Sequence, residues 1–262
     1  MSGLDYTGKR AVVTGCASGI GAATARLLVD LGAEVHGLDR NGTSVPVARF
    51  DTVDLGDSGS IDAVVDRLGG GIDALFNCAG LAPTYPKIDV LKVNFLGTRH
   101  LTQRILGRMG EGGAIVTTSS NGGLGYRAHL VELIDLLDTA TFADGLAWIE
   151  KHQAAIANAY SYSKEALTVW TLRESAKTIE RGVRMNCTSP GAVQTPMLDQ
   201  IEARVATAVI DAVAQPFGRR ATPEEQAWPL VFLNCSAASY INGADLPVDG
   251  GFAAGLTLRS PL

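Results

Sequence analysis

The sequence predicts an α/β fold, with helices on both faces of a doubly wound, parallel sheet. Short apolar stretches alternate with longer stretches in which apolar residues recur at helical spacing. A glycine-rich turn joins the first such pair, and distinctive residues such as Gly15, Asp39 and Ser120 lie at the ends of predicted strands. Because parallel strands present their carboxyl ends at one edge of a sheet, where ligands bind, these residues also predict a binding site.

Length and composition favour one domain over residues 1–262. The 262 residues are 46% hydrophobic, which is enough for a sizeable core, and no repeat or linker divides them. The net charge is −5 and no long basic block occurs, so a nucleic-acid partner is not expected.

Location and metal content are also predicted from composition. The first residues lack the apolar stretch of a signal peptide, and no apolar run is long enough to span a bilayer. The four cysteines are scattered, and the histidines form no metal-binding spacing. We therefore expect a cytoplasmic protein without a metal site or a membrane partner.

The first βα unit spans residues 10–31. A buried strand over 10–14 precedes a turn with Gly15, Gly19 and Gly21, and a helix follows over 22–31. Glycines let the backbone approach a pyrophosphate, which the positive end of the helix attracts. The spacing is GxxxGxG rather than GxGxxG, so an ordinary glycine turn is the alternative.

A second strand over residues 34–39 ends in an acid. Asp39 lies 18 residues after Gly21, near the separation expected for a carboxylate that binds a ribose 2′-hydroxyl. Such an acid would repel a 2′-phosphate, which favours NAD over NADP. Arg40 follows directly and could accept that phosphate, and a solvent-facing acid is the plain alternative.

Three more strands are expected before residue 120. They cover 45–50, 72–77 and 114–118, with helices from Ser58 and over 90–106 between them. Polar residues again follow the strands: Asp54 after the third, Asn77 at the end of the fourth, and Ser120 after the fifth.

Residues 121–157 form a long connection with two amphipathic helical patterns. The first has Leu130, Leu133, Ile134 and Leu137 on one face. A lid over the site, a subunit contact and a helical insertion that completes the core all remain open. Our hypothesis is that the four apolar residues are buried against the molecule or a second subunit, and thereby narrow the pocket for a flat, apolar substrate.

Tyr160 and Lys164 are four residues apart at the start of the next helical pattern. On a helix this spacing places them on one face, one turn apart. A lysine ammonium can lower the pKa of a tyrosine, which is ordinarily about 10, so that the phenol can move a proton near neutral pH. A chance pairing on a solvated helix is the alternative for the pair by itself.

The last third of the chain continues the alternation. A sixth strand over residues 183–188 leads into Pro190 and Gly191, and residues 197–214 have a helical pattern that could cover a pocket. Thr222 and Pro223 mark a helix start, and residues 245–251 supply a last strand and its exit.

Together these residues resemble the short-chain dehydrogenase/reductase family over roughly residues 8–252. The motifs are Thr14-Gly15-x-x-x-Gly19-Ile20-Gly21, Asn77-x-Ala79-Gly80, Asn94, Ser119-Ser120, Tyr160-x-x-x-Lys164 and Pro190-Gly191. The 40 positions between Ser120 and Tyr160 exceed the interval usual in that family. This resembles the subgroup of bacterial 3α-hydroxysteroid dehydrogenase/carbonyl reductases and coniferyl-alcohol dehydrogenases. The segments 164–170, 183–187 and 241–243 are more similar to the latter.

The resemblance implies a single Rossmann-type domain with a seven-stranded sheet, NAD as cofactor, and a homodimer or homotetramer. It implies catalytic roles for Asn94, Ser120, Tyr160 and Lys164. It implies cofactor contacts by Gly15, Ser18, Gly19, Ile20, Gly21, Asp39, Arg40, Asp54, Leu55, Asn77, Ala79, Gly80, Tyr160, Lys164, Pro190, Gly191, Val193 and Thr195. The implied activity interconverts a hydrophobic alcohol, of the aryl allylic or hydroxysteroid type, and its carbonyl compound. A catalytically silent dinucleotide-binding sensor or scaffold is the alternative.

Overall fold

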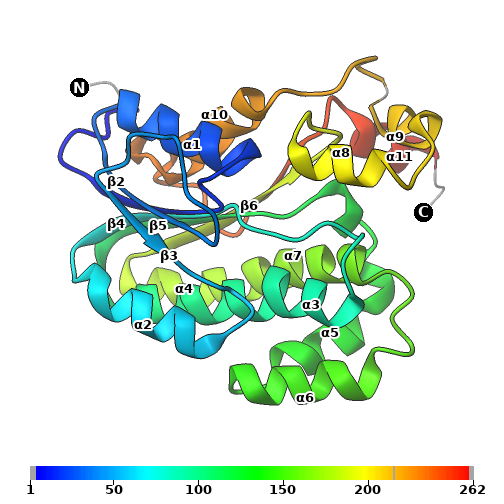
Figure 1. Ribbon diagram of the computed structural model, residues 1–262, viewed down its shortest axis with the longest axis horizontal. Coiled ribbons are helices and arrows are strands. Elements are labelled where there is room, and N and C mark those ends of the chain that lie inside the picture. Colours follow the sequence, from blue (N-terminus) through cyan, green and yellow to red (C-terminus); the bar gives the residue numbers. More distant parts are fainter. Residues whose placement is uncertain (1–3, 215, 260–262) are drawn as a thin grey trace.

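A seven-stranded parallel sheet forms the centre of the molecule, and the predicted doubly wound fold is confirmed (Figure 1). The computed structural model describes residues 4–214 and 216–259, so the expected domain ends at 1 and 262 lie outside the described residues. The sheet order is β3-β2-β1-β4-β5-β6-β7. The strands are β1 (Arg10–Thr14), β2 (Glu34–Asp39), β3 (Arg49–Thr52), β4 (Ile72–Asn77), β5 (Met109–Thr118), β6 (Arg184–Pro190) and β7 (Asp245–Val248).

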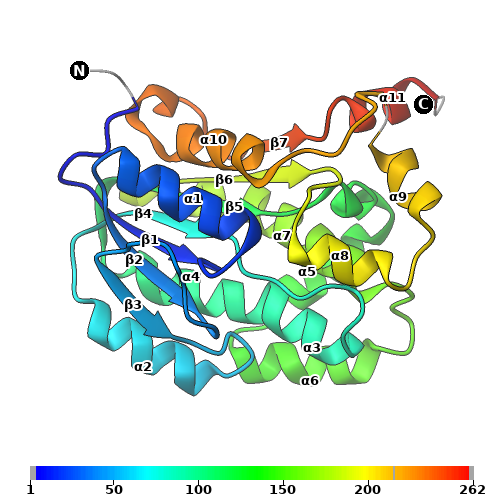
Figure 2. The same ribbon diagram turned by 45° about the horizontal axis from the view of Figure 1, so that its top comes forward.

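Helices cover both faces of this sheet. One face carries α1 (Gly19–Asp30) and α10 (Pro223–Asn234), and the other carries α2 (Ser58–Leu68), α4 (Thr98–Leu106) and α7 (Ala159–Thr178) (Figures 1 and 2). The order of the sheet reverses between β1 and β4, which is the point where a doubly wound sheet opens for a ligand. The other helices are α3 (Lys87–Leu91), α5 (Leu130–Leu137), α6 (Phe142–His152), α8 (Pro196–Glu202), α9 (Thr207–Val213) and α11 (Phe252–Arg259).

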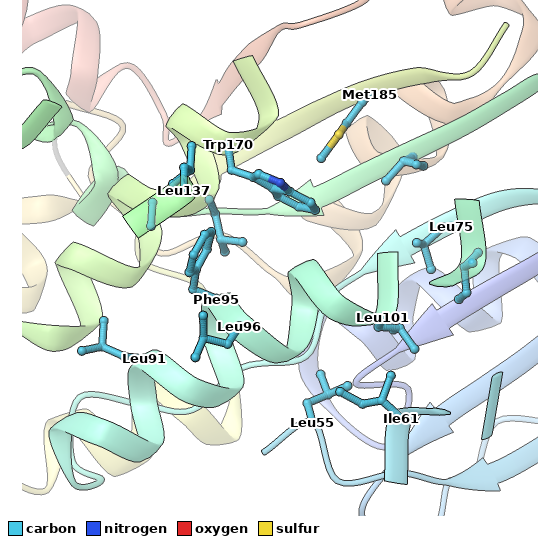
Figure 3. Packing of buried hydrophobic residues seen from close by; sticks show 14 of the residues in the cluster. Leu55, Ile61, Leu75, Leu91, Phe95, Leu96, Leu101, Leu137, Trp170 and Met185 are labelled. Atoms are coloured by element: carbon cyan, nitrogen blue, oxygen red, sulfur yellow. The ribbon is translucent and has the colours of Figure 1, made fainter. Parts of the chain in front are cut away.

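Apolar side chains fill the space between the sheet and each helical layer. On the face of α2, α4 and α7, Phe95, Leu137 and Trp170 lie close together (Figure 3). The rings of Phe95 and Trp170 meet edge to face, with centroids 6.4 Å apart. On the opposite face, Leu28 and Phe76 are fully buried. The core therefore holds the strand ends rigidly at the edge where the site forms.

Several predicted elements have different bounds in the structure, such as β5, which begins at Met109 and not at 114. The third strand begins at Arg49, not at 45, because Pro46 has no backbone N–H to donate to a sheet. The helix expected over 90–106 is divided into α3, a π-helical turn η1 (Lys92–Gly97) and α4. The helix expected over 197–214 is two short helices, α8 and α9, with residues 203–206 between them.

The connection before Tyr160 contains the two predicted helices, α5 and α6, after the short 3-10 turns η2 (Asn121–Gly123) and η3 (Tyr126–His129). Leu133 and Leu137 are buried, but Leu130 and Ile134 are 39% and 41% exposed, so the chain itself buries only two of the four expected residues. Leu136 is buried in their place, because the face of α5 that meets α7 carries residues 133, 136 and 137.

Among the described residues, no helix has both the length and the apolar character needed to cross a membrane.

Candidate active site

The carboxyl edge of the sheet borders a cavity of about 300 Å³. The structure brings most of the expected site residues together on its wall. These are Gly15, Ser18, Gly19, Ile20, Gly21, Asp39, Arg40, Asp54, Leu55, Ala79, Gly80, Ser120, Tyr160, Lys164, Pro190, Gly191, Val193 and Thr195. They come from segments up to 180 positions apart, so only the parallel sheet makes them neighbours.

Asn77 does not line this cavity, which corrects the expected cofactor contact. Its side-chain amide donates to the hydroxyls of Thr102 (2.9 Å) and Thr117 (3.2 Å) and is buried between β4, α4 and β5. The polar group at this strand end therefore joins the sheet to a helix. The residues that follow it, Cys78, Ala79 and Gly80, form the wall.

The glycine turn after β1 is packed too tightly for side chains. Gly15 has φ +72°, and a Cβ there would lie 2.8 Å from Ala79 Cα. A Cβ on Gly21 would lie 2.1 Å from Gly15 O. The Thr14 hydroxyl accepts hydrogen bonds from the amides of Cys78 and Ala79, at 3.1 Å each, and so fixes the two turns against each other.

Helix α1 begins at the end of this turn and presents its N-terminus to the cavity. Its N-cap residue, Ser18, makes no side-chain capping bond, so the side chain leaves the first-turn amides for another acceptor. Backbone amides and the helix dipole together attract a phosphate. The cavity, the glycines and this helix end therefore fit the pyrophosphate of a dinucleotide.

The acid and the base at the end of β2 have different partners. Asp39 accepts hydrogen bonds from the amides of Ala17 (3.0 Å) and Asn41 (2.9 Å), which hold its carboxylate beside the glycine turn. The Arg40 guanidinium donates to the Tyr85 hydroxyl (3.2 Å) and lies 5.8 Å from the centre of that ring. Arg40 therefore bonds to another residue of the cavity wall, a partner that the sequence did not reveal.

The side chains of Ser120 and Tyr160 both lie close to Gly122. The Ser120 hydroxyl accepts from the Gly122 amide (3.1 Å), and a Cβ on Gly122 would lie 3.4 Å from Ser120 Oγ and 3.6 Å from Tyr160 Cε1. The neighbouring serine has a different partner, because the Ser119 hydroxyl donates to the main-chain carbonyl of Lys164 (3.0 Å) and so ties β5 to α7.

The electrostatics of this wall differ from the sequence-based expectation. Burial raises the pKa of the Tyr160 phenol, and a hydrogen bond with Ser120 partly opposes that rise. Burial also lowers the pKa of Lys164 to about 8. The Lys164 ammonium donates to the Thr118 carbonyl (2.8 Å) and lies 5.7 Å from the centre of the Tyr160 ring. The hydrogen bond with Ser120 is therefore the contact that lowers the pKa of the tyrosine against the effect of burial, while the ammonium bonds to the backbone.

Asn94 lies in η1, behind the cavity wall. Its side chain accepts from the Leu81 amide (2.6 Å) and donates to the Leu81 carbonyl (3.1 Å) and to the Ser163 hydroxyl (3.2 Å). A Cβ on Gly80 would lie 3.3 Å from Asn94 Oδ1 and 3.9 Å from Lys164 Nζ. Asn94 thus fixes the loop at Leu81 close to the lysine.

Comparison with known proteins agrees with this arrangement. Residues 9–132 match the family model described as short chain dehydrogenase, and residues 147–253 match the one described as Enoyl-(Acyl carrier protein) reductase. The chain is 38% identical over 252 residues to a coniferyl-alcohol dehydrogenase of Pseudomonas sp., covering 96% of this chain and 99% of that protein. The chain belongs to the short-chain dehydrogenase/reductase family. It is an oxidoreductase of that family, whose members bind NAD(P).

Two further members of the family are similar over nearly their whole length. A 3-alpha-hydroxysteroid dehydrogenase/carbonyl reductase of Comamonas testosteroni is 34% identical over 251 residues, covering 93% of this chain and 96% of that protein. The crystal structure of a 3-alpha-hydroxysteroid dehydrogenase from Pseudomonas sp. B-0831, complexed with NADH, is 31% identical with a TM-score of 0.81. It covers 97% of this chain and 100% of that one.

Part of the cavity wall is formed by residues that the family motifs do not mark. These include Leu81 and Ala82, and Met197 and Ile201 of α8. In the sequence, the helical pattern over residues 197–214, with apolar residues on one face, predicted that this segment could cover a pocket.

Of residues 121–157, all within the described chain, none lines this cavity. Helices α5 and α6 instead pack beside α3 and α7, away from α8 (Figures 1 and 2). The hypothesis that they narrow the main pocket is therefore wrong, and their buried face extends the core of this dehydrogenase/reductase.

Proposed function

We propose that the protein is an NAD-dependent dehydrogenase that interconverts a hydrophobic alcohol and its carbonyl compound. One observation carries the proposal: Ser120, Tyr160 and Lys164 share a wall of the cavity that begins at the N-terminus of α1. A hydroxyl pair beside a buried cation can act on an alcohol oxygen, and the helix end can hold the cofactor.

In this mechanism Tyr160 moves the proton at the substrate oxygen. Its phenol takes the proton during oxidation and returns it during reduction, while the Ser120 hydroxyl holds the same oxygen. The dinucleotide, when bound, accepts or supplies the hydride. Lys164 would hold the nicotinamide ribose and carry charge beside Tyr160, and a water held at Asn94 would give the proton a route to solvent.

The cofactor contacts follow from the order of the wall residues. The amides after Ser18 would bind the pyrophosphate, and Asp39 would accept from the hydroxyls of the adenine ribose. Asp54 and Leu55 would border the adenine, and the segment from Pro190 to Thr195 would border the nicotinamide. The carboxylate of Asp39 disfavours a 2′-phosphate, and the partner that Arg40 finds in Tyr85 supports NAD as the preferred cofactor.

The substrate class follows from apolar side chains on the cavity wall. Leu81, Met197 and Ile201 suit a flat or alicyclic hydrocarbon body. The names of two relatives, a coniferyl-alcohol dehydrogenase and a 3-alpha-hydroxysteroid dehydrogenase/carbonyl reductase, support aryl allylic alcohols or hydroxysteroids as the substrate class.

Assembly into a homodimer or homotetramer and a cytoplasmic location complete the proposal. Leu130, Val131 and Ile134 form an exposed apolar row on α5 that could contact a second subunit of a homodimer or homotetramer. The four cysteines are free, which suits the reducing cytoplasm.

The test is turnover of coniferyl alcohol and of a 3α-hydroxysteroid with NAD and NADP, in the native protein and in Tyr160→Phe. We expect the variant to retain NAD affinity and to lose at least about a hundredfold in kcat, because the proton-transfer group is gone. Tyr162→Phe is the matched control. Its hydroxyl has no partner among the described residues, and its ring packs against Trp148.

Two outcomes would contradict the proposal. Near-normal turnover in Tyr160→Phe would remove the tyrosine from the mechanism. Binding of NAD without turnover of any alcohol by the native protein would indicate a silent dinucleotide-binding protein.

A further inference from the structure

A second cavity, of about 710 Å³, lies between the ends of β6 and β7, the loop before α10, and α11. Leu124, Ala192, Phe217, Val248 and Ala254 supply its apolar surface. Both ribbon views place α11 beside α9, at the end of the molecule that also carries α8 (Figures 1 and 2). This volume is in the range of sites for small molecules.

Charged and hydroxyl side chains on this wall already have partners. Arg219 pairs with both carboxylate oxygens of Glu225 (2.7 and 2.6 Å), and Asp249 accepts from the amides of Gly251 (2.9 Å) and Ala253 (2.8 Å). The Thr257 hydroxyl donates to the Ala253 carbonyl (3.0 Å). The Gln226 side chain donates to the Val248 carbonyl (3.1 Å), and its buried oxygen has no partner among the described residues. The cavity therefore offers contact area without a free charge, which suits a hydrocarbon segment.

The second cavity adjoins the proposed reaction centre. Gly191 lines both cavities, so they share a wall at the end of β6. Leu124 directly follows the turn Asn121–Gly123, whose N-cap is Ser120. This apolar space therefore borders the main cavity at Gly191, beside the segment that begins at Ser120.

We propose that the second cavity binds the apolar tail of an extended alcohol or carbonyl substrate. The inference rests on the proposed function and deepens it: the preferred substrate carries a hydrocarbon chain beyond the reacting carbon. Each methylene group that leaves water on entering the cavity should raise kcat/KM roughly threefold to fourfold. The dependence of kcat/KM on chain length therefore measures how far the tail extends into the cavity.

The experiment measures NAD-linked oxidation of primary alcohols from butan-1-ol to dodecan-1-ol. In the native protein we expect kcat/KM to rise with chain length, mainly through KM. Ala254→Trp fills the cavity and should cancel the rise for the long alcohols while butan-1-ol is oxidised as before. Thr257→Trp obstructs the same wall from one turn farther along α11. Leu258→Trp is the matched control, because Leu258 is 89% exposed and does not line the cavity.

The outcomes separate this inference from the proposed function. A length dependence that survives both Ala254→Trp and Thr257→Trp, or that Leu258→Trp abolishes equally, overturns the subsite. Altered sedimentation of Ala254→Trp with an unchanged length dependence assigns the cavity to a subunit contact and also overturns it. If no alcohol is oxidised, the proposed function fails. Calorimetric binding of decan-1-ol that Ala254→Trp abolishes would then still support the cavity, and no binding to the native protein would overturn it.

Discussion

Replacing Lys164 with Met should change how the stability of the protein depends on pH. The Lys164 side chain is buried, and the pKa of its ammonium is lowered to about 8 from an ordinary value of 10.5. Below pH 8 the group is charged in both states. Between pH 8 and 10.5 it is charged only in the unfolded chain. The unfolded chain therefore binds more protons in this window, and the native protein becomes more stable as the pH rises through it.

The size of the effect follows from the two pKa values. One unit of pKa shift corresponds to about 1.4 kcal/mol, and most of the shift is realised between pH 7 and pH 9.5. Over that interval the native protein should gain about 2 kcal/mol in free energy of unfolding relative to Lys164→Met, which has no group to titrate at this position. Taking the difference between the two proteins cancels the other ionisable groups.

The assay is urea unfolding of both proteins at pH 7 and pH 9.5. Lys177→Met is the control, because this lysine is exposed and its ammonium is 2.8 Å from Glu174. The difference in free energy of unfolding between this variant and the native protein should change little with pH. If the free energy of unfolding changed equally with pH in the native protein and in Lys164→Met, the claim that burial lowers the pKa of Lys164 would be refuted. Lys164→Met should also lose turnover, because the cation beside Tyr160 is absent.

Two further predictions concern the cofactor and the connection before Tyr160. Asp39→Ala should narrow the preference for NAD over NADP, measured as the ratio of kcat/KM values, because the charge repulsion is removed. If the unmodified protein used NADP more efficiently than NAD, Arg40 and not Asp39 would be the residue that recognises the adenine ribose. Leu133→Ala should lower the free energy of unfolding by about 2 to 5 kcal/mol, because Leu133 is fully buried. Glu132→Ala, on the exposed side of α5, should change it by less than about 0.5 kcal/mol, and equal losses in the two variants would contradict the observed orientation of the helix.

Local physics determined which elements form. Thr222 and Pro223 begin α10 as predicted, because a capping box with Glu225 satisfies the first amides of the helix from within four residues. The four-residue spacing of Tyr160 and Lys164 is also a local feature. Helix geometry places residues at this spacing on one face, and both line the same cavity. Parallel strand order then placed Gly15, Asp39 and Ser120 at one edge.

Only the tertiary structure decided what each side chain meets. Asn77 turns toward Thr102 and Thr117, and Arg40 turns toward Tyr85, contacts between residues 25 to 45 positions apart that no periodicity encodes. The lowered pKa of Lys164 likewise depends on burial by the whole fold. Sequence patterns therefore specified the elements and the edge where the site lies. Packing between distant segments decided the partners, the charge of the lysine and the second cavity, because desolvation and contact depend on neighbours that only the complete fold supplies.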